Sequence, residues 1–172
     1  MARALLSLTV IALLQIGLPT LVAYWQGRRG GDFHRWQSLG CRLWISFVFV
    51  AIGFGHFINP AFVAELLPPF IPFPYLMSYL SGAAEILMVV GLWSSQQRWA
   101  GLVMIAWLAA ILPFNIYGWT IPGAGRMNPN FETSPYYLVL RIPLQAIWIY
   151  LVYVASGQSW RENFWPRTRA TA

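Results

Sequence analysis

A single carboxylate stands in the middle of a long uncharged stretch of the sequence. Residues 75–93 contain no charged side chain other than Glu85. At 1.5 Å per residue from Tyr75, a helix over this stretch places Glu85 about 15 Å deep, near the midplane of a bilayer. An acid without a partner costs about 2.5 to 3.5 kcal/mol there on insertion scales. The sequence must therefore supply partners for Glu85 or use it for chemistry.

Other polar residues of the apolar segments are expected near the same depth. Arg141 and Gln145 lie about 7.5 and 13.5 Å from the outer end of the last apolar segment, and residues four apart share one face of a helix. We expect Arg141 to pair with Glu85 and Gln145 to bond the carboxylate from the side. Ser81 and Gly82 keep the preceding turn of the Glu85 face small, which lets a neighbouring helix approach closely.

His56, Asn59 and Asn115 complete a candidate polar route from the outer face to the midplane. One interpretation is structural: the polar residues fix the helix register, and His56 and Asn115 satisfy backbone groups freed by Pro60 and Pro113. The other is a ligand or proton site between the helices. No residue is assigned a catalytic role. One His beside one acid offers too few ligands to favour a metal site.

The composition predicts an integral membrane protein with an all-α fold. Of the 172 residues, 58% are hydrophobic and 9% are charged, which is not the balance of a soluble domain. Five apolar segments are expected to span the membrane as helices, over residues 4–25, 43–58, 75–93, 99–117 and 136–154. Between the second and third, residues 60–67 can form two helical turns in the outer interface, with Pro60 at the first position.

The first segment has the position of a signal peptide. Its run of 22 apolar or uncharged residues is longer than an ordinary signal sequence, and no small-x-small cleavage site follows it. We therefore expect a retained helix, with a cleaved signal peptide as the alternative. The expected organisation is an N-terminal transmembrane helix with a basic cytoplasmic linker over 1–42, a four-helix bundle over 43–156 and a cytoplasmic tail over 157–172.

The basic residues are all arginines, and most of them lie at the ends of apolar runs. This placement is typical of topology determinants that face lipid head groups, and it does not favour nucleic-acid binding. One side of the predicted topology carries eight of them, so this side and the C-terminus are expected to be cytoplasmic. These eight are Arg28, Arg29, Arg35, Arg42, Arg98, Arg161, Arg167 and Arg169. The lone Cys41 excludes an internal disulfide and a CxxC thiol relay.

Five short motifs between residues 43 and 156 resemble the DoxX-like family of small bacterial integral membrane proteins. They are GHF at 55–57 with Pro60, Pro68-Pro69, SGAAE at 81–85, LPFNI around Pro113 and Asn115, and RIPLQ at 141–145. The resemblance implies a four-helix bundle in the bacterial cytoplasmic (inner) membrane. It also implies relatives linked to thiosulfate–quinone oxidoreduction or to membrane-bound redox assemblies. The N-terminal segment and a longer outer loop are additions to that pattern.

Together, these observations predict an accessory or scaffold subunit of a larger membrane complex for redox chemistry or energy conversion. We expect it to carry no intrinsic cofactor, to contact other membrane subunits and to bind a quinone or a lipid between its helices. The alternative is the membrane subunit of a quinone-linked oxidoreductase, in which Glu85 and His56 handle protons. A transporter is disfavoured because the sequence has no inverted halves.

Overall fold

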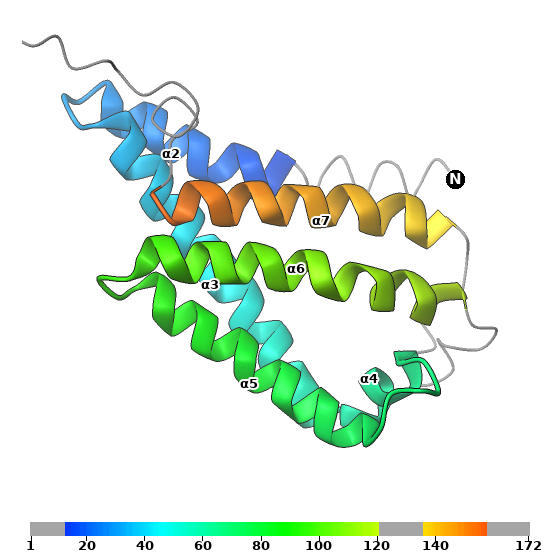
Figure 1. Ribbon diagram of the computed structural model, residues 1–172. Helices are drawn as coiled ribbons and strands as arrows, with labels where there is room; N and C mark the ends of the chain where they lie inside the picture. The colour runs from blue at the N-terminus through cyan, green and yellow to red at the C-terminus, as the bar shows by residue number, and fades with distance from the viewer. Residues whose placement is uncertain (1–12, 121–135, 158–172) are drawn as a thin grey trace, which may run out of the picture.

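The structure, a computed structural model, describes residues 13–120 and 136–157, and every element in these two ranges is a helix (Figure 1). The elements are the π-helix η1 (Leu13–Gly17), followed by α2 (Leu18–Gly27), α3 (Phe33–Ile58), α4 (Pro60–Leu66), α5 (Pro74–Leu92), α6 (Gln97–Thr120) and α7 (Tyr136–Ala155). The all-α class predicted from composition is confirmed for this part of the chain.

Three of these helices are long and apolar enough to cross a membrane. They are α3, α5 and the Gln97–Gly118 part of α6, and a shorter apolar helix covers Ile142–Ala155 of α7. Large apolar side chains point away from the protein along the long helices; Phe47 and Leu87, for example, are both 68% exposed. An outward apolar face on a helix of this length suits contact with lipid tails. Residues 4–12 of the first apolar segment, the loop over 121–135 and the tail over 158–172 lie outside the described residues.

Helix α3 begins at Phe33, well before the apolar run that starts at Leu43. The side chain of Asp32 accepts hydrogen bonds from the backbone N–H groups of His34 and Arg35, at 2.9 and 3.4 Å, and so caps the first turn. Hydropathy identifies the part of a helix that can lie in lipid, but it does not identify the residue at which the helix begins. Residues 33–42, predicted as part of a linker, are therefore the opening turns of α3.

Proline sets the start of the two elements that follow α3. Pro60 opens α4, and the Asn59 side chain caps this helix by accepting a hydrogen bond from the Phe62 N–H at 3.3 Å. Pro74 opens α5 in the same way. Proline suits the first helical position because its missing N–H would have no partner there. The short helix predicted over 60–67 is confirmed.

The long helices form two pairs, α3 with α5 and α6 with α7, and the two pairs diverge (Figure 1). In Figure 1, α6 and α7 run side by side, while α5 leaves α6 at an angle after the turn that connects them, and α4 lies where the two are furthest apart. Helix α3 packs against α5 and α7, and α4 contacts both α5 and α6. The bundle is therefore closed at the α5–α6 turn and wedge-shaped toward α4.

Helix α2 is part of this packing. Pro19 and Ala23 are buried, and a Cβ on Gly40 of α3 would meet Pro19 at 3.1 Å. On the other side, the Trp148 indole N–H of α7 donates a hydrogen bond to the buried side chain of Gln15 at 3.2 Å. The described part of the first apolar segment is thus joined to α3 and α7.

The apolar core fills the closed half of the bundle. Phe49 of α3 packs edge to face on Trp148 of α7, with ring centroids 5.8 Å apart. The other buried apolar residues of this cluster are Cys41, Ile45, Met88, Val89, Leu92, Met104, Leu108, Leu151, Val152 and Ala155. Aliphatic, aromatic and sulfur-containing side chains meet here, and the inward polar residues lie further along the same helices, toward α4.

Candidate functional site

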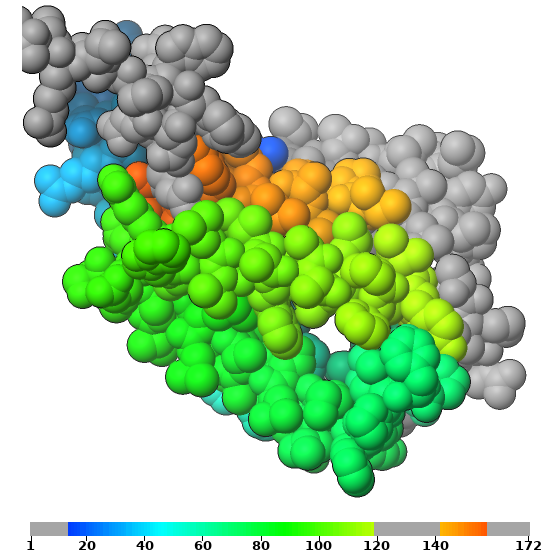
Figure 2. All heavy atoms as spheres, in the orientation of Figure 1, coloured from blue at the N-terminus to red at the C-terminus, as the bar shows by residue number. Residues whose placement is uncertain are grey.

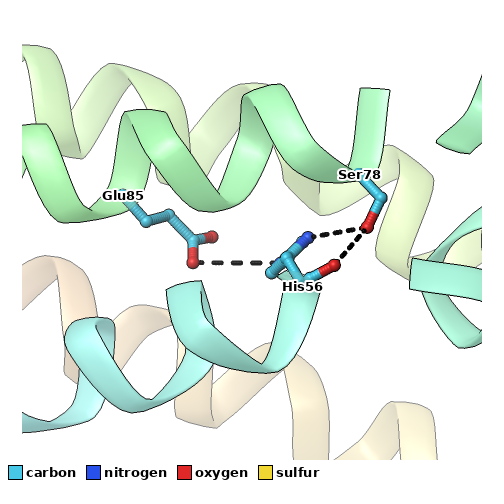
Figure 3. A network of polar contacts seen from close by, with 3 residues as sticks. All are labelled: His56, Ser78 and Glu85. Carbon is cyan, nitrogen blue, oxygen red and sulfur yellow. Dashed lines mark hydrogen bonds and ion pairs between the residues drawn. The ribbon is translucent and has the colours of Figure 1, made fainter. Parts of the chain in front are cut away.

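The structure brings an ionisable residue of α3 and one of α5 together. Nε2 of His56 on α3 lies 3.9 Å from Oε2 of Glu85 on α5 (Figure 3). Glu85 is only 3% exposed, and the His56 side chain is 12% exposed. The imidazole therefore faces the carboxyl group across the interface between two helices, both of them long and apolar enough to span a membrane.

Ser78 holds the other side of the His56 ring. Its hydroxyl oxygen lies 3.4 Å from Nδ1, and the same hydroxyl donates to the His56 backbone carbonyl at 3.3 Å. Because a serine has one proton to donate, the contact with Nδ1 is satisfied when Nδ1 carries a proton and the serine oxygen accepts it. In a neutral imidazole of that tautomer, Nε2 presents its lone pair to Glu85.

Two glycines allow this contact between helices. A Cβ on Gly82 would lie 2.6 Å from the carbonyl oxygen of Gly53 and 2.8 Å from Cβ of His56. A Cβ on Gly53 would lie 3.0 Å from the carbonyl oxygen of Gly82. The backbones of α3 and α5 therefore touch one turn from Glu85, and only glycine at both positions permits it. The small face predicted at Gly82 is used in this way.

Gln145 comes from α7 at the level of Glu85. It lies one turn before Trp148 on α7. Trp148 packs on Phe49 of α3, and Phe49 lies one turn before Gly53, where α3 approaches α5. Its side chain is 1% exposed, and Nε2 donates to the backbone carbonyl of Leu108 on α6 at 2.6 Å. Its Oε1 has no hydrogen-bond partner within the described residues. The amide thus ties α7 to α6 and keeps a buried acceptor.

Asn115 lies on the inward face of α6. It shares one face of the helix with Ile111, Leu108 and Met104, because these residues follow one another at spacings of four, three and four. Met104 and Leu108 are buried, so this face points inward. Three residues further on, a Cβ on Gly118 would lie 2.7 Å from the carbonyl oxygen of Leu66 in α4, which places Asn115 close to α4. Its Nδ2 is buried, and among the described residues it has no hydrogen-bond partner.

The remaining predicted site residues have different outcomes. The side chain of Arg141 lies outside the described residues, so its pairing with Glu85 stays a prediction. Asn59 caps α4, which is a structural role. Ser78, and not Ser81, makes the serine contact with His56. Ser78 could have been found from its spacing, because a residue seven before Glu85 lies two turns away on the same helix face.

The inward polar residues line the half of the bundle where the helices diverge. His56, Ser78, Glu85, Asn115 and Gln145 come from α3, α5, α6 and α7. Figure 2 shows the surface hollowed between α6, α5 and α4 on this side of the molecule. We call these five residues the polar half. Within the described residues there is no group of three or more His, Cys, Asp or Glu placed to hold a metal ion.

Comparison with known proteins identifies a family. No curated protein and no solved structure matches the chain. One family model, described as a domain of unknown function (DUF8561), matches residues 45–156, a region that contains α4, α5, α6, α7 and most of α3. All five residues of the polar half lie inside the matched region. The chain belongs to the DUF8561 family.

Proposed function

We propose that the chain is a small integral membrane protein that binds a lipid-soluble molecule through an oxygen-bearing head group in the polar half, as an accessory subunit of a larger membrane complex. In this proposal α3, α5, α6 and α7 are the four core spans and α2 belongs to an additional N-terminal span. The bound molecule is a quinone or a lipid.

The buried His56–Glu85 pair is the observation that carries the proposal. An ionisable residue inside a membrane is expensive to keep, and it commonly marks a ligand or proton site. Here two such residues face each other from neighbouring helices at 3.9 Å. A carboxyl group and an imidazole can each donate or accept a hydrogen bond, depending on where the proton lies. They therefore suit carbonyl or hydroxyl oxygens.

Gln145 and Asn115 add a buried acceptor and a buried donor. Burying a polar atom without a hydrogen bond costs about 1 to 3 kcal/mol. The described residues give neither Gln145 Oε1 nor Asn115 Nδ2 a partner. A head group with both hydrogen-bonding characters would satisfy these two atoms, whereas a purely apolar ligand would leave them unsatisfied.

The resemblance to the DoxX-like family supports the same proposal. As an expectation, the resemblance implies a bundle in the bacterial inner membrane and a role beside a redox or energy-converting complex. The described arginines near the N-terminal end of α3 and the α5–α6 turn support a cytoplasmic position for this end of the bundle, and hence for the C-terminus.

A second candidate is the membrane subunit of a quinone-linked oxidoreductase. The contacts on both ring nitrogens of His56 favour it, because an imidazole can take a proton on one nitrogen and release one from the other. In this candidate electrons pass from a partner subunit to the quinone, and the Glu85–His56 pair supplies the protons that complete the quinol.

The experiment is purification in a gentle detergent followed by mass spectrometry of the small molecules that remain bound. We expect a molecule of the quinone or lipid class in near-stoichiometric amount, and about tenfold less of it in Glu85→Gln and His56→Asn, because each variant removes a hydrogen bond to an ionisable group. Glu65→Gln and His34→Asn make the same chemical changes at exposed positions and should retain the molecule. Equal retention by Glu85→Gln and wild type would contradict the proposal.

A further inference from the structure

The turn between α2 and α3 gathers three exposed arginines, far from the polar half. Arg28 and Arg29 follow α2 directly, and Arg35 lies in the first turn of α3. Gly30 has a φ of 85°, a left-handed conformation that glycine adopts without strain. The N–H groups of Arg29 and Gly31 both bond to the carbonyl of Gln26, at 3.1 Å, so the turn is tight. The turn therefore brings the backbones of the three arginines close together.

Aromatic rings hold the first two guanidinium groups. Cζ of Arg29 lies 3.6 Å from the ring centroid of Trp25, and Cζ of Arg28 lies 5.8 Å from that of Tyr24. Both rings are more than half exposed. Stacking uses the flat face of a guanidinium group and leaves the N–H donors at its edge directed outward, where they can bind the oxygens of an anion.

The charge of this cluster is not neutralised within the described residues. Asp32 is the nearest acid in sequence, and one of its carboxylate oxygens accepts hydrogen bonds from the backbone N–H groups of His34 and Arg35. None of the three arginines forms an ion pair with a described carboxylate. The turn therefore presents three positive charges and one carboxylate, a net positive charge, beside the N-terminal end of α3, whose helix dipole adds to the positive potential.

Apolar surface adjoins the cluster. Leu21 and Val22, about two turns before Arg28 on α2, are 66% and 47% exposed. Leu43 and Phe47, on α3, are also exposed, at 56% and 68%. A phosphate ion in solution would use only the arginines, whereas a phospholipid would use both features, with its acyl chains along α2 and α3. Exposed Tyr and Trp at the boundary mark the depth of lipid head groups.

We propose that Arg28, Arg29 and Arg35 form a binding site for the phosphodiester head group of an anionic phospholipid. A guanidinium group matches the geometry of phosphate oxygens and binds two of them at once. A lipid with a net negative charge, such as phosphatidylglycerol, is favoured over zwitterionic phosphatidylcholine, whose choline cation would face the same arginines. This site is separate from the polar half and does not depend on its ligand.

The test is native mass spectrometry of the full chain in detergent, titrated separately with phosphatidylglycerol and phosphatidylcholine. We expect tighter binding of phosphatidylglycerol, and an affinity about fivefold weaker in each of Arg28→Gln and Arg29→Gln, the effect of one arginine at an anionic surface. Arg98→Gln removes an exposed arginine at the α5–α6 turn and is the matched control, with an affinity within twofold of wild type.

Two outcomes would overturn the proposal. Equal binding of the two lipids would mean that the surface recognises acyl chains and not the head-group charge. An equal loss in Arg98→Gln would mean that the attraction comes from the net charge of this end of the molecule and not from the turn. The substituted side chains are exposed, so these variants are expected to remain folded.

Discussion

Replacing Gly82 with valine should force α3 and α5 apart and lower the free energy of unfolding by about 3 kcal/mol or more. A Cβ at this position would lie 2.6 Å from the Gly53 carbonyl oxygen, 2.8 Å from Cβ of His56 and 3.0 Å from Cε2 of Phe57. The first of these atoms is backbone, so no change of rotamer relieves the clash. The measurement is unfolding by a denaturing detergent, followed by circular dichroism.

Gly55→Ala is the matched control for this prediction. Gly55 lies in the same region of α3, but an added Cβ there has nothing within 4 Å. Alanine is also the better helix former, so this variant should be as stable as wild type or slightly more stable. If Gly82→Val unfolds at the same detergent concentration as wild type, the close approach of α3 and α5 is wrong, and with it the position of His56 beside Glu85.

Replacing Glu85 with leucine should lower the free energy of unfolding by about 3 kcal/mol, because it removes one member of a buried pair and leaves His56 facing an apolar side chain. The same measurement on His56→Leu and on the double variant completes a double-mutant cycle. We expect a coupling energy of about 1 kcal/mol or more between the two residues.

A second cycle, of Glu85→Leu with Arg141→Met, tests the pairing predicted from the sequence. Both couplings can exist together, because a carboxylate has two oxygens and can serve both partners. Additivity of the His56 and Glu85 variants within about 0.5 kcal/mol would mean that the two side chains do not interact, against the 3.9 Å contact.

The helices themselves were largely predictable from the sequence. Apolar runs of near-membrane length predicted α5, α6 and α7 to within a few residues, and Pro60 predicted the start of α4. The start of α3 was not predicted from hydropathy, because its first turns carry Arg35 and Arg42 and depend on the cap by Asp32. The sequence signal for the start of α3 is a capping residue, Asp32, before a basic stretch, and a hydropathy profile does not detect such a residue.

Four of the five residues of the polar half were candidates from the sequence, whereas Ser78 and the contacts between the residues were not. Depth along a helix follows from counting residues, so Glu85 and Gln145 were expected at one level. The packing of Trp148 on Phe49 and the close approach of Gly53 to Gly82 agree with that level. Depth does not reveal which helices are neighbours or how each is rotated. The contact of His56 with Glu85 depends on the close approach at Gly82, and a sequence shows a small residue without showing what lies against it.

Gln145 and the arginine turn illustrate the same limit. The amide of Gln145 was expected to bond the Glu85 carboxylate, and this bond stays a prediction. The structure shows that its nitrogen donates to the Leu108 carbonyl, an acceptor present at every residue and therefore invisible in a sequence. Arg28 and Arg29 were interpreted only as topology determinants. Their stacking on Tyr24 and Trp25 is a local contact of α2 that charge counting does not include.

A crystal structure of the full chain, purified with its native lipids and grown in a lipidic mesophase, tests the central claim most directly. The account predicts non-protein density beside the polar half, with an oxygen about 2.7 to 3.2 Å from the Glu85 carboxyl group or from His56 Nε2. It is contradicted if side chains of the protein fill the space beside the polar half and satisfy Gln145 Oε1 and Asn115 Nδ2 by themselves, because the polar half would then be a structural network with no room for a ligand.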